Sequence, residues 1–349
     1  MLGVDRRAFR ITWTVCLFAL LLLLIYYIRE TLLVFAAAIF LAYILAPIVS
    51  LVERFVLKRR GLALGIVYIL LIGALVGLGF ALVPKLASEA TSLATRLPGL
   101  LAKGTLATLP LPSWAEPARE QVVEALRRQA ANLQSSVVPF IQRLSTEILS
   151  GVSYLLPIIL VPILTFFFLK DAREIRAALL DLFDGERRRT AELIMNDIHV
   201  VLRNYMRTLI LLAAASFAAW AIFLSIMDEP YVLLLAGTAG VLEFIPVVGP
   251  AAALVLILVI CGLAGTGGLL WILAFWALYR VFQDYVLNPY LMSSGVELHP
   301  LLVLFGVLAG EKVGGIPGMF FSVPALAIAK VVLTHLRTAS AAKRFAEMR

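Results

Sequence analysis

A few ionisable and hydrogen-bonding side chains interrupt the otherwise apolar last third of this chain. Glu243 stands inside a long apolar segment, where a carboxylate is costly unless it is paired or faces a polar cavity. One interpretation is a group that binds a proton or a cation. The other is a carboxylate at the water interface, or one that caps a helix end.

A second polar cluster follows later in the sequence. Arg280 and Asp284 have the i, i+4 spacing that places two side chains on one face of a helix, so they are expected to pair. Gln283 and Asn288 add hydrogen-bonding groups near the same end. His299 precedes Pro300, where a histidine either binds a proton or a ligand or simply begins a helix. The cluster is therefore a structural helix pair or part of a binding site.

The composition defines what surrounds these groups. Of 349 residues, 62% are hydrophobic and 15% are charged, with a mean hydropathy of +0.98. One soluble core cannot bury so much apolar surface, which predicts an all-α polytopic protein in contact with membrane lipid. The net charge of +8 fits Lys and Arg at cytoplasmic helix ends. No nucleic-acid-binding motif is present, so no nucleic acid partner is expected.

About eight hydrophobic segments are predicted, at residues 11–28, 31–49, 62–83, 152–169, 202–227, 231–263, 269–287 and 298–335. Basic residues before the first and after the second place the N-terminus in the cytoplasm, and the C-terminus is expected there too. The predicted regions are N-terminal transmembrane helices (1–84), an amphipathic extracytoplasmic helical insert (85–150), transmembrane helices with a charged cytoplasmic hairpin at 170–199 (151–230), a C-terminal transport region (231–337) and a cytoplasmic tail (338–349).

Two of these segments are cut near their middles, one by "IPVVGP" and one by "GEKVGGIPG". Proline removes a backbone donor and glycine permits non-helical angles, so each is predicted to be a broken helix or a re-entrant hairpin. Paired breaks favour a secondary transporter whose hairpin tips approach each other around a polar cargo. Simple packing kinks are the alternative. The break residues are Pro246, Gly249, Pro250, Gly310, Gly314, Gly315, Pro317 and Gly318.

The blocks "FIPVVGP" and "FQDYVLNPYLMSSGVELHPLLVLFGVLAGEKVGGIPGMFFSVPALAIAKVV" resemble the C-terminal signature of the AI-2E family of bacterial membrane permeases. The resemblance extends over nearly the whole chain. It implies a multi-pass protein of the bacterial inner membrane that forms a homo-oligomer. The family is known for exporters of autoinducer-2, a quorum-sensing signal, and also contains proposed sodium/proton antiporters, so the cargo is not fixed.

Missing motifs narrow the chemistry further. No G-x-x-x-x-G-K-[ST] phosphate loop occurs, so any pumping should use an ion gradient, and no cofactor is expected. H-E-x-x-H is missing and the three histidines lack ligand spacing, which argues against a metal site and against an enzyme. Three functions stay open. They are efflux of a small polar molecule, cation/proton antiport through Glu243 or Asp284, and a structural or regulatory role without cargo.

Overall fold

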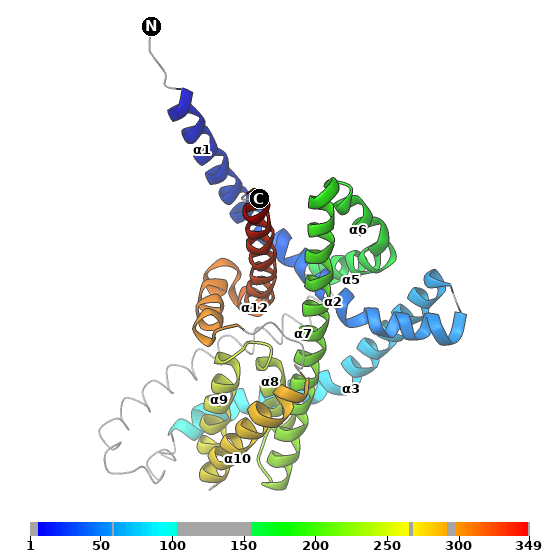
Figure 1. The fold of residues 1–349 in the computed structure, drawn as a ribbon. Helices are drawn as coiled ribbons and strands as arrows, with labels where there is room; N and C mark the ends of the chain where they lie inside the picture. The colour runs from blue at the N-terminus through cyan, green and yellow to red at the C-terminus, as the bar shows by residue number, and fades with distance from the viewer. Residues whose placement is uncertain (1–5, 58, 103–154, 265–267, 292–297, 348–349) are drawn as a thin grey trace.

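The computed structural model describes residues 6–57, 59–102, 155–264, 268–291 and 298–347, and every element within these ranges is a helix (Figure 1). Five of the helices are long and apolar enough to cross a membrane, and shorter apolar helices accompany them. The predicted all-α polytopic class is therefore confirmed. Most of the predicted extracytoplasmic insert, from residue 103 onward, lies outside the described residues.

The N-terminal helices present most of their apolar surface outward. They are α1 (Arg6–Tyr27), α2 (Arg29–Val52), the π-helix η1 (Glu53–Leu57) and α3 (Arg60–Ala102). Leu23 of α1 and Phe80 of α3 are 70% and 82% exposed. Large side chains of this kind are stable there only against lipid or another apolar surface, which is the arrangement expected of membrane-spanning helices.

The middle of the chain forms a short hairpin and a long rod. After α5 (Leu155–Lys170), the amphipathic α6 (Ala172–Leu180) turns back to α7 (Gly185–Ile226). Exposed ion pairs join these turns: Arg188 lies 3.0 Å from Asp181, and Arg176 lies 3.7 Å from Glu192. The predicted charged hairpin at 170–199 is thus α6 with the first part of α7. Helix α7 begins at Gly185, well before the predicted apolar span at 202–227, and ends at Ile226.

The last third of the chain contains α8 (Val232–Leu242), α9 (Val248–Ala264), α10 (Leu269–Phe282), the π-helix η4 (Gln283–Leu287), α11 (Asn288–Leu291) and α12 (Pro300–Glu347). The apolar segment predicted at 231–263 is therefore two helices, α8 and α9, and the break falls at the predicted "IPVVGP" stretch.

Helix α7 organises the core. At one end its Trp220 and Leu224 pack with buried residues of α8, α9 and α10. Near its middle, Leu202 and Met206 pack with Phe40 of α2 and with aromatic residues of α12. A separate cluster joins α2, α3 and α5. Figure 1 shows α7 running between the α8–α10 group and the α5–α6 group. The polar residues of the last third are thus placed against a single central helix.

The first break is a tight reversal with a strained residue. Gly249 lies so close to the carbonyl of Leu242 that a Cβ atom at this position would overlap it. Val247 has a φ of +67°, a left-handed conformation that β-branched residues rarely adopt and that costs roughly 1–3 kcal/mol. Helices α8 and α9 therefore form a hairpin whose tip is residues 243–247.

The second break folds α12 back on itself. Gly315 has a φ of +59°, in the left-handed region that favours glycine. The backbones of Gly310 and Gly318 touch, so that a Cβ on either glycine would overlap the carbonyl of the other. A Cβ on Gly306 would likewise meet Leu326. Residues before and after the break therefore run side by side, and the predicted interruption of this segment is confirmed.

The tips of these hairpins were expected to approach each other, and an aromatic contact joins the first tip to the second hairpin. Phe244 of the first tip packs on Phe320, with ring centroids 5.6 Å apart, along the flank of the second hairpin. Gly314 of the second tip lies instead against Leu33 of α2. Phe244 thereby joins the aromatic cluster of Phe40, Phe320 and Phe321, in which tilted and edge-on ring contacts stabilise the packing.

Candidate functional site

A cavity of about 280 Å³ lies where α7, the first hairpin tip, the end of α10 and both arms of α12 meet. Most of its wall is apolar, as is common for ligand cavities. Polar groups gather in one part of it. They are Asn204, Tyr205 and Thr208 of α7, Glu243 at the end of α8, and Arg280, Gln283 and Asn288 from α10, η4 and α11.

Glu243 is buried, with 7% of its side chain exposed, and it follows the last residue of α8. Its Oε1 accepts a hydrogen bond of 2.5 Å from Nε2 of Gln283 and lies 3.6 Å from Nη1 of Arg280. The water-interface interpretation of Glu243 therefore does not hold, because the carboxylate is held inside the protein. A buried carboxylate needs such partners to offset its lost hydration.

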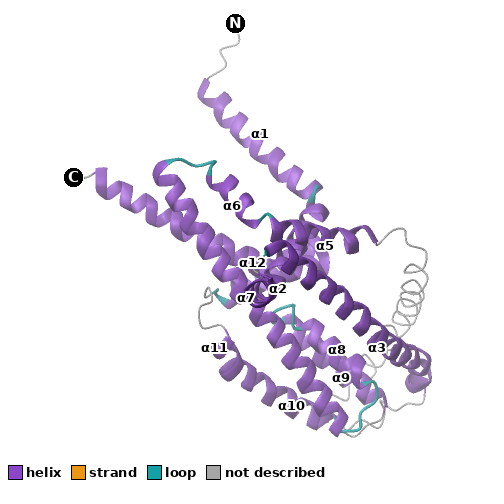
Figure 2. Cartoon of the chain, turned by 90° about the vertical axis from the view of Figure 1, so that its right-hand side faces the viewer, coloured by secondary structure: helices purple, strands orange, loops and turns teal. Residues whose placement is uncertain are grey.

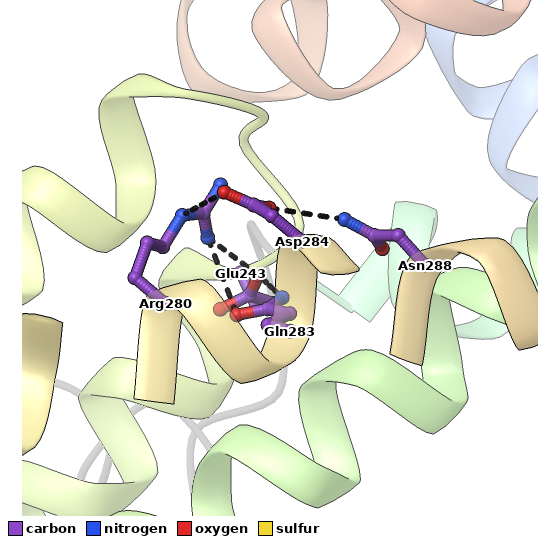
Figure 3. Close-up of polar contacts among 5 residues, drawn as sticks. All are labelled: Glu243, Arg280, Gln283, Asp284 and Asn288. Atoms are coloured by element: carbon purple, nitrogen blue, oxygen red, sulfur yellow. Dashed lines mark hydrogen bonds and ion pairs between the residues drawn. The ribbon is translucent and has the colours of Figure 1, made fainter. Parts of the chain in front are cut away.

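Arg280 joins this buried pair to the second carboxylate (Figure 3). As their spacing predicts, Arg280 Nε lies 3.5 Å from Asp284 Oδ2, and Arg280 also donates to Gln283 Oε1 at 3.3 Å. Asn288 Nδ2 extends the chain by donating to Asp284 Oδ1 at 3.1 Å. One guanidinium thus lies between a buried and a half-exposed carboxylate, which leaves the network with one negative charge in excess when both acids are ionised.

The π-helix η4 positions Gln283 for this role. The backbone N–H of Asn288 bonds to the carbonyl of Gln283, which is the wider i to i+5 turn of a π-helix. Gln283 itself is only 1% exposed, although its neighbours on η4 are exposed. The widened turn therefore buries one amide against Glu243 while Asp284 stays near the surface. Single π turns of this kind occur frequently at functional sites.

Helix α7 supplies polar groups that sequence reasoning missed. Thr208 Oγ1 donates to the carbonyl of Leu291 at 3.0 Å, which ties the end of α11 to α7. The hydroxyl of Tyr205 is buried and has no hydrogen-bond partner among the described residues. A buried polar atom left in this state is unusual in a folded protein and is a natural partner for a bound solute. The i, i+4 spacing of Asn204 and Thr208 was the available signal.

The structure brings together only part of the predicted set. Glu243, Arg280, Gln283, Asp284 and Asn288 form one network, and Pro246 and Pro250 line the same cavity. His299 is exposed at the start of α12, where its Nδ1 accepts the backbone N–H of Leu301 at 3.3 Å. The second-break residues Gly310, Gly314, Gly315, Pro317 and Gly318 lie outside the cavity lining and shape the hairpin instead.

Within the described ranges, no group of three or more His, Cys, Asp or Glu side chains is placed to hold a metal ion. The network pairs two carboxylates with a guanidinium and two amides, which is chemistry suited to hydrogen bonding and charge pairing. What the arrangement can do is bind a polar group at Gln283, Tyr205 and Asn288, or exchange a cation or proton at Glu243.

Apolar helices long enough to span a membrane, interrupted segments and a mainly apolar cavity with several polar groups on its wall are together typical of a polytopic membrane protein of the permease type. Residues 15–338 match the family described as AI-2E family transporter, and the chain belongs to this family.

Two relatives show how far the likeness extends. "Putative transport protein YrrI" of Bacillus subtilis is 25% identical over 308 residues, which cover 85% of this chain and 84% of that protein. "Putative permease PerM" of Escherichia coli K12 is 28% identical over 310 residues, which cover 85% and 84% of the two chains. Neither name states a transported solute.

Proposed function

We propose that this protein is a secondary transporter that exports a small polar molecule such as autoinducer-2, using the cavity at the first hairpin tip. The observation that supports it most directly is a mainly apolar cavity whose wall also carries several hydrogen-bonding groups. One of them, the Tyr205 hydroxyl, has no hydrogen-bond partner among the described residues. The cavity volume of about 280 Å³ is near the lower end of ligand cavities, roughly 300–1,000 Å³, which favours a small solute.

The charge arrangement supports a neutral or weakly charged cargo. Arg280 lies 3.6 Å from Glu243 and repels a cation that approaches the same carboxylate. Glu243 Oε1 is also occupied by the Gln283 amide. A polar molecule can instead exchange hydrogen bonds with Gln283 and Asn288 without displacing a charge. Export in this scheme is an expectation that rests on the family resemblance.

Cation/proton antiport is the second candidate, and one observation favours it. Glu243 is a buried carboxylate on the cavity wall whose ion pair with Arg280 would be broken by a proton and could re-form when the proton leaves. The two candidates therefore share a site but differ in whether Glu243 must titrate during transport.

The cellular arrangement is part of the same proposal. The N-terminal helix, the end of α12 and the charged α6 hairpin, with its Lys and Arg residues, lie toward one end of the molecule (Figures 1 and 2). By the positive-inside rule this end faces the cytoplasm of a bacterial inner membrane. The exposed apolar faces of α1 and α3 are then covered by lipid or by further copies of the chain in a homo-oligomer.

The test measures efflux of autoinducer-2 from loaded proteoliposomes. Efflux should require the protein and should fall about ten-fold in Glu243→Gln, because this change removes a charge-assisted hydrogen bond to Gln283 and the pairing with Arg280. The matched control is Glu311→Gln, which makes the same chemical change at an exposed carboxylate of the second break. If proteoliposomes with the wild-type protein retained autoinducer-2 as well as protein-free liposomes do, autoinducer-2 would be excluded as the transported solute.

A sodium jump with an internal pH dye separates the second candidate. Sodium-driven proton movement that is lost in Glu243→Gln and kept in Glu311→Gln would establish antiport. Folded, inserted protein that moves no protons, but releases the signal, would establish efflux of the polar molecule.

A further inference from the structure

A second cavity, of about 500 Å³, lies between α2, α5, α6 and α7. It shares only α7 with the cavity at the first hairpin tip, and the residues that line the two cavities are different. Its wall has a basic part and an apolar part. The inference drawn from it is independent of which solute the protein transports.

Three arginines form the basic part. Arg60 donates to the carbonyl of Leu169 at 2.6 and 3.2 Å and so is fixed at the end of α5. Arg176 donates to Asn196 at 2.8 Å and lies 3.7 Å from Glu192. Arg173 makes no ion pair among the described residues, and no carboxylate side chain is part of the cavity lining. The cavity therefore carries an excess of positive charge.

The apolar part is formed by α2 and α5. Ile39, Ala42 and Ala46 of α2 line it together with Phe168 of α5. The two alanines have small side chains, so this part of the lining is apolar and leaves room for an apolar chain. An inorganic anion would use the basic part alone. A ligand that fills the whole cavity needs an anionic head and an apolar chain.

Helix α6 places the mouth of this cavity at a membrane surface. Its residues Ile175 and Leu179 are large, apolar and exposed, and so are Leu182 and Phe183 just beyond its end, while Ile175, Leu179 and Arg173 also line the cavity. A short helix with this distribution typically lies in the plane of the lipid headgroups. Figure 2 shows α6 beside α5 at the end of the molecule where α1 begins.

We propose that this cavity binds an anionic phospholipid from the cytoplasmic leaflet. Arg173 and Arg176 hold the phosphate, because guanidinium groups bind phosphate oxygens through paired hydrogen bonds. One acyl chain lies along Ala42, Ala46 and Phe168. Basic pockets between transmembrane helices on the cytoplasmic side are a recurrent way of binding acidic lipids. A bound lipid would join α2, α5, α6 and α7 at the end opposite to α10.

Native mass spectrometry of the purified full-length protein tests this, with phosphatidylglycerol and phosphatidylcholine of identical chains added in parallel. Wild type should retain phosphatidylglycerol at concentrations at least five-fold lower than phosphatidylcholine. Arg173→Gln with Arg176→Gln should remove that preference, whereas the Lys replacements at both positions should keep most of it. The control pair, Arg187→Gln with Arg189→Gln, removes the same charge from exposed positions of α7 and should leave the preference unchanged.

A third variant tests the apolar part without changing charge. Ala46→Phe should weaken phosphatidylglycerol binding several-fold, because the larger side chain fills the apolar part of the cavity. Equal loss of preference in the control pair would overturn the site, because it would show a diffuse charge effect. If glycerol phosphate bound as tightly as phosphatidylglycerol and displaced it, the ligand would be a soluble anion and the phospholipid proposal would be wrong. An unchanged preference for phosphatidylglycerol in the Arg173→Gln, Arg176→Gln variant would also overturn the proposed site.

Discussion

The two interrupted segments of the last third share sequence features but have different surroundings. Both contain an Ile-Pro step and glycines, and both reverse the chain. The first break carries a buried carboxylate, borders a cavity and is tied to Gln283 and Arg280. The second break carries the exposed Glu311 and Lys312 and is held by close backbone contact of glycines. A proline-glycine break therefore marks a reversal of the chain, and only the neighbouring helices decide whether that reversal is a site.

The largest expected effect comes from the second break. Gly318→Ala should destabilise the protein by about 3 kcal/mol, because the new Cβ overlaps backbone atoms of Gly310 that have no room to move. The loss is measured as a lower melting temperature by size-exclusion after heating in detergent. Gly77→Ala in α3 is the control, since no atom lies within 4 Å of its added Cβ. Equal stability of the two variants would contradict the close packing of the hairpin arms.

The first break should respond to a change of charge as well as to added volume. Glu243→Leu leaves Arg280 without its buried partner and should cost about 2 kcal/mol, whereas Glu311→Leu should cost less than about 0.5 kcal/mol.

A double-mutant cycle checks the origin of that cost. Adding Arg280→Met to Glu243→Leu should recover part of the lost stability, because the unpaired charge is removed with its partner. Strict additivity of the two single changes in the same melting assay would show that the pair is not coupled.

Asp284 should matter less than Glu243, although both contact Arg280. The Asp284 side chain is 45% exposed, so water competes with its ion pair. Asp284→Asn should lower stability by less than about 1 kcal/mol, and raising the salt concentration should reduce the difference from wild type. A loss as large as that of Glu243→Leu would mean that Asp284 is part of the buried network.

The smallest effect is expected at His299. His299→Ala removes the side chain that accepts the Leu301 N–H at the start of α12 and should cost about 0.5 kcal/mol, with solute efflux unchanged. His299→Asn, which keeps a capping acceptor, should restore the lost stability. Efflux that falls strongly in both variants would place His299 in the transport path.

The sequence predicted the elements better than their partners. Apolar runs predicted the helices, and prolines and glycines predicted both breaks, because these are local properties of the chain. The i, i+4 rule gave the pairing of Arg280 with Asp284. The bond from Gln283 to Glu243 joins positions forty residues apart, so no local rule could have supplied it. The second arm of the predicted hairpin and the predicted span at 202–227 are one continuous helix, α7, and hydropathy did not show this because it detects only the apolar part of a helix.

The length of α7 has a mechanical consequence. Its 42 residues extend roughly 63 Å at 1.5 Å per residue, about twice the hydrocarbon thickness of a bilayer. One end contacts α6 beside the cavity lined by Arg173 and Arg176, and the middle carries Asn204, Tyr205 and Thr208, which line the cavity at the first hairpin tip. An unbroken helix of this length behaves as a lever. A tilt imposed at its N-terminal end would displace the wall of the cavity at the first hairpin tip.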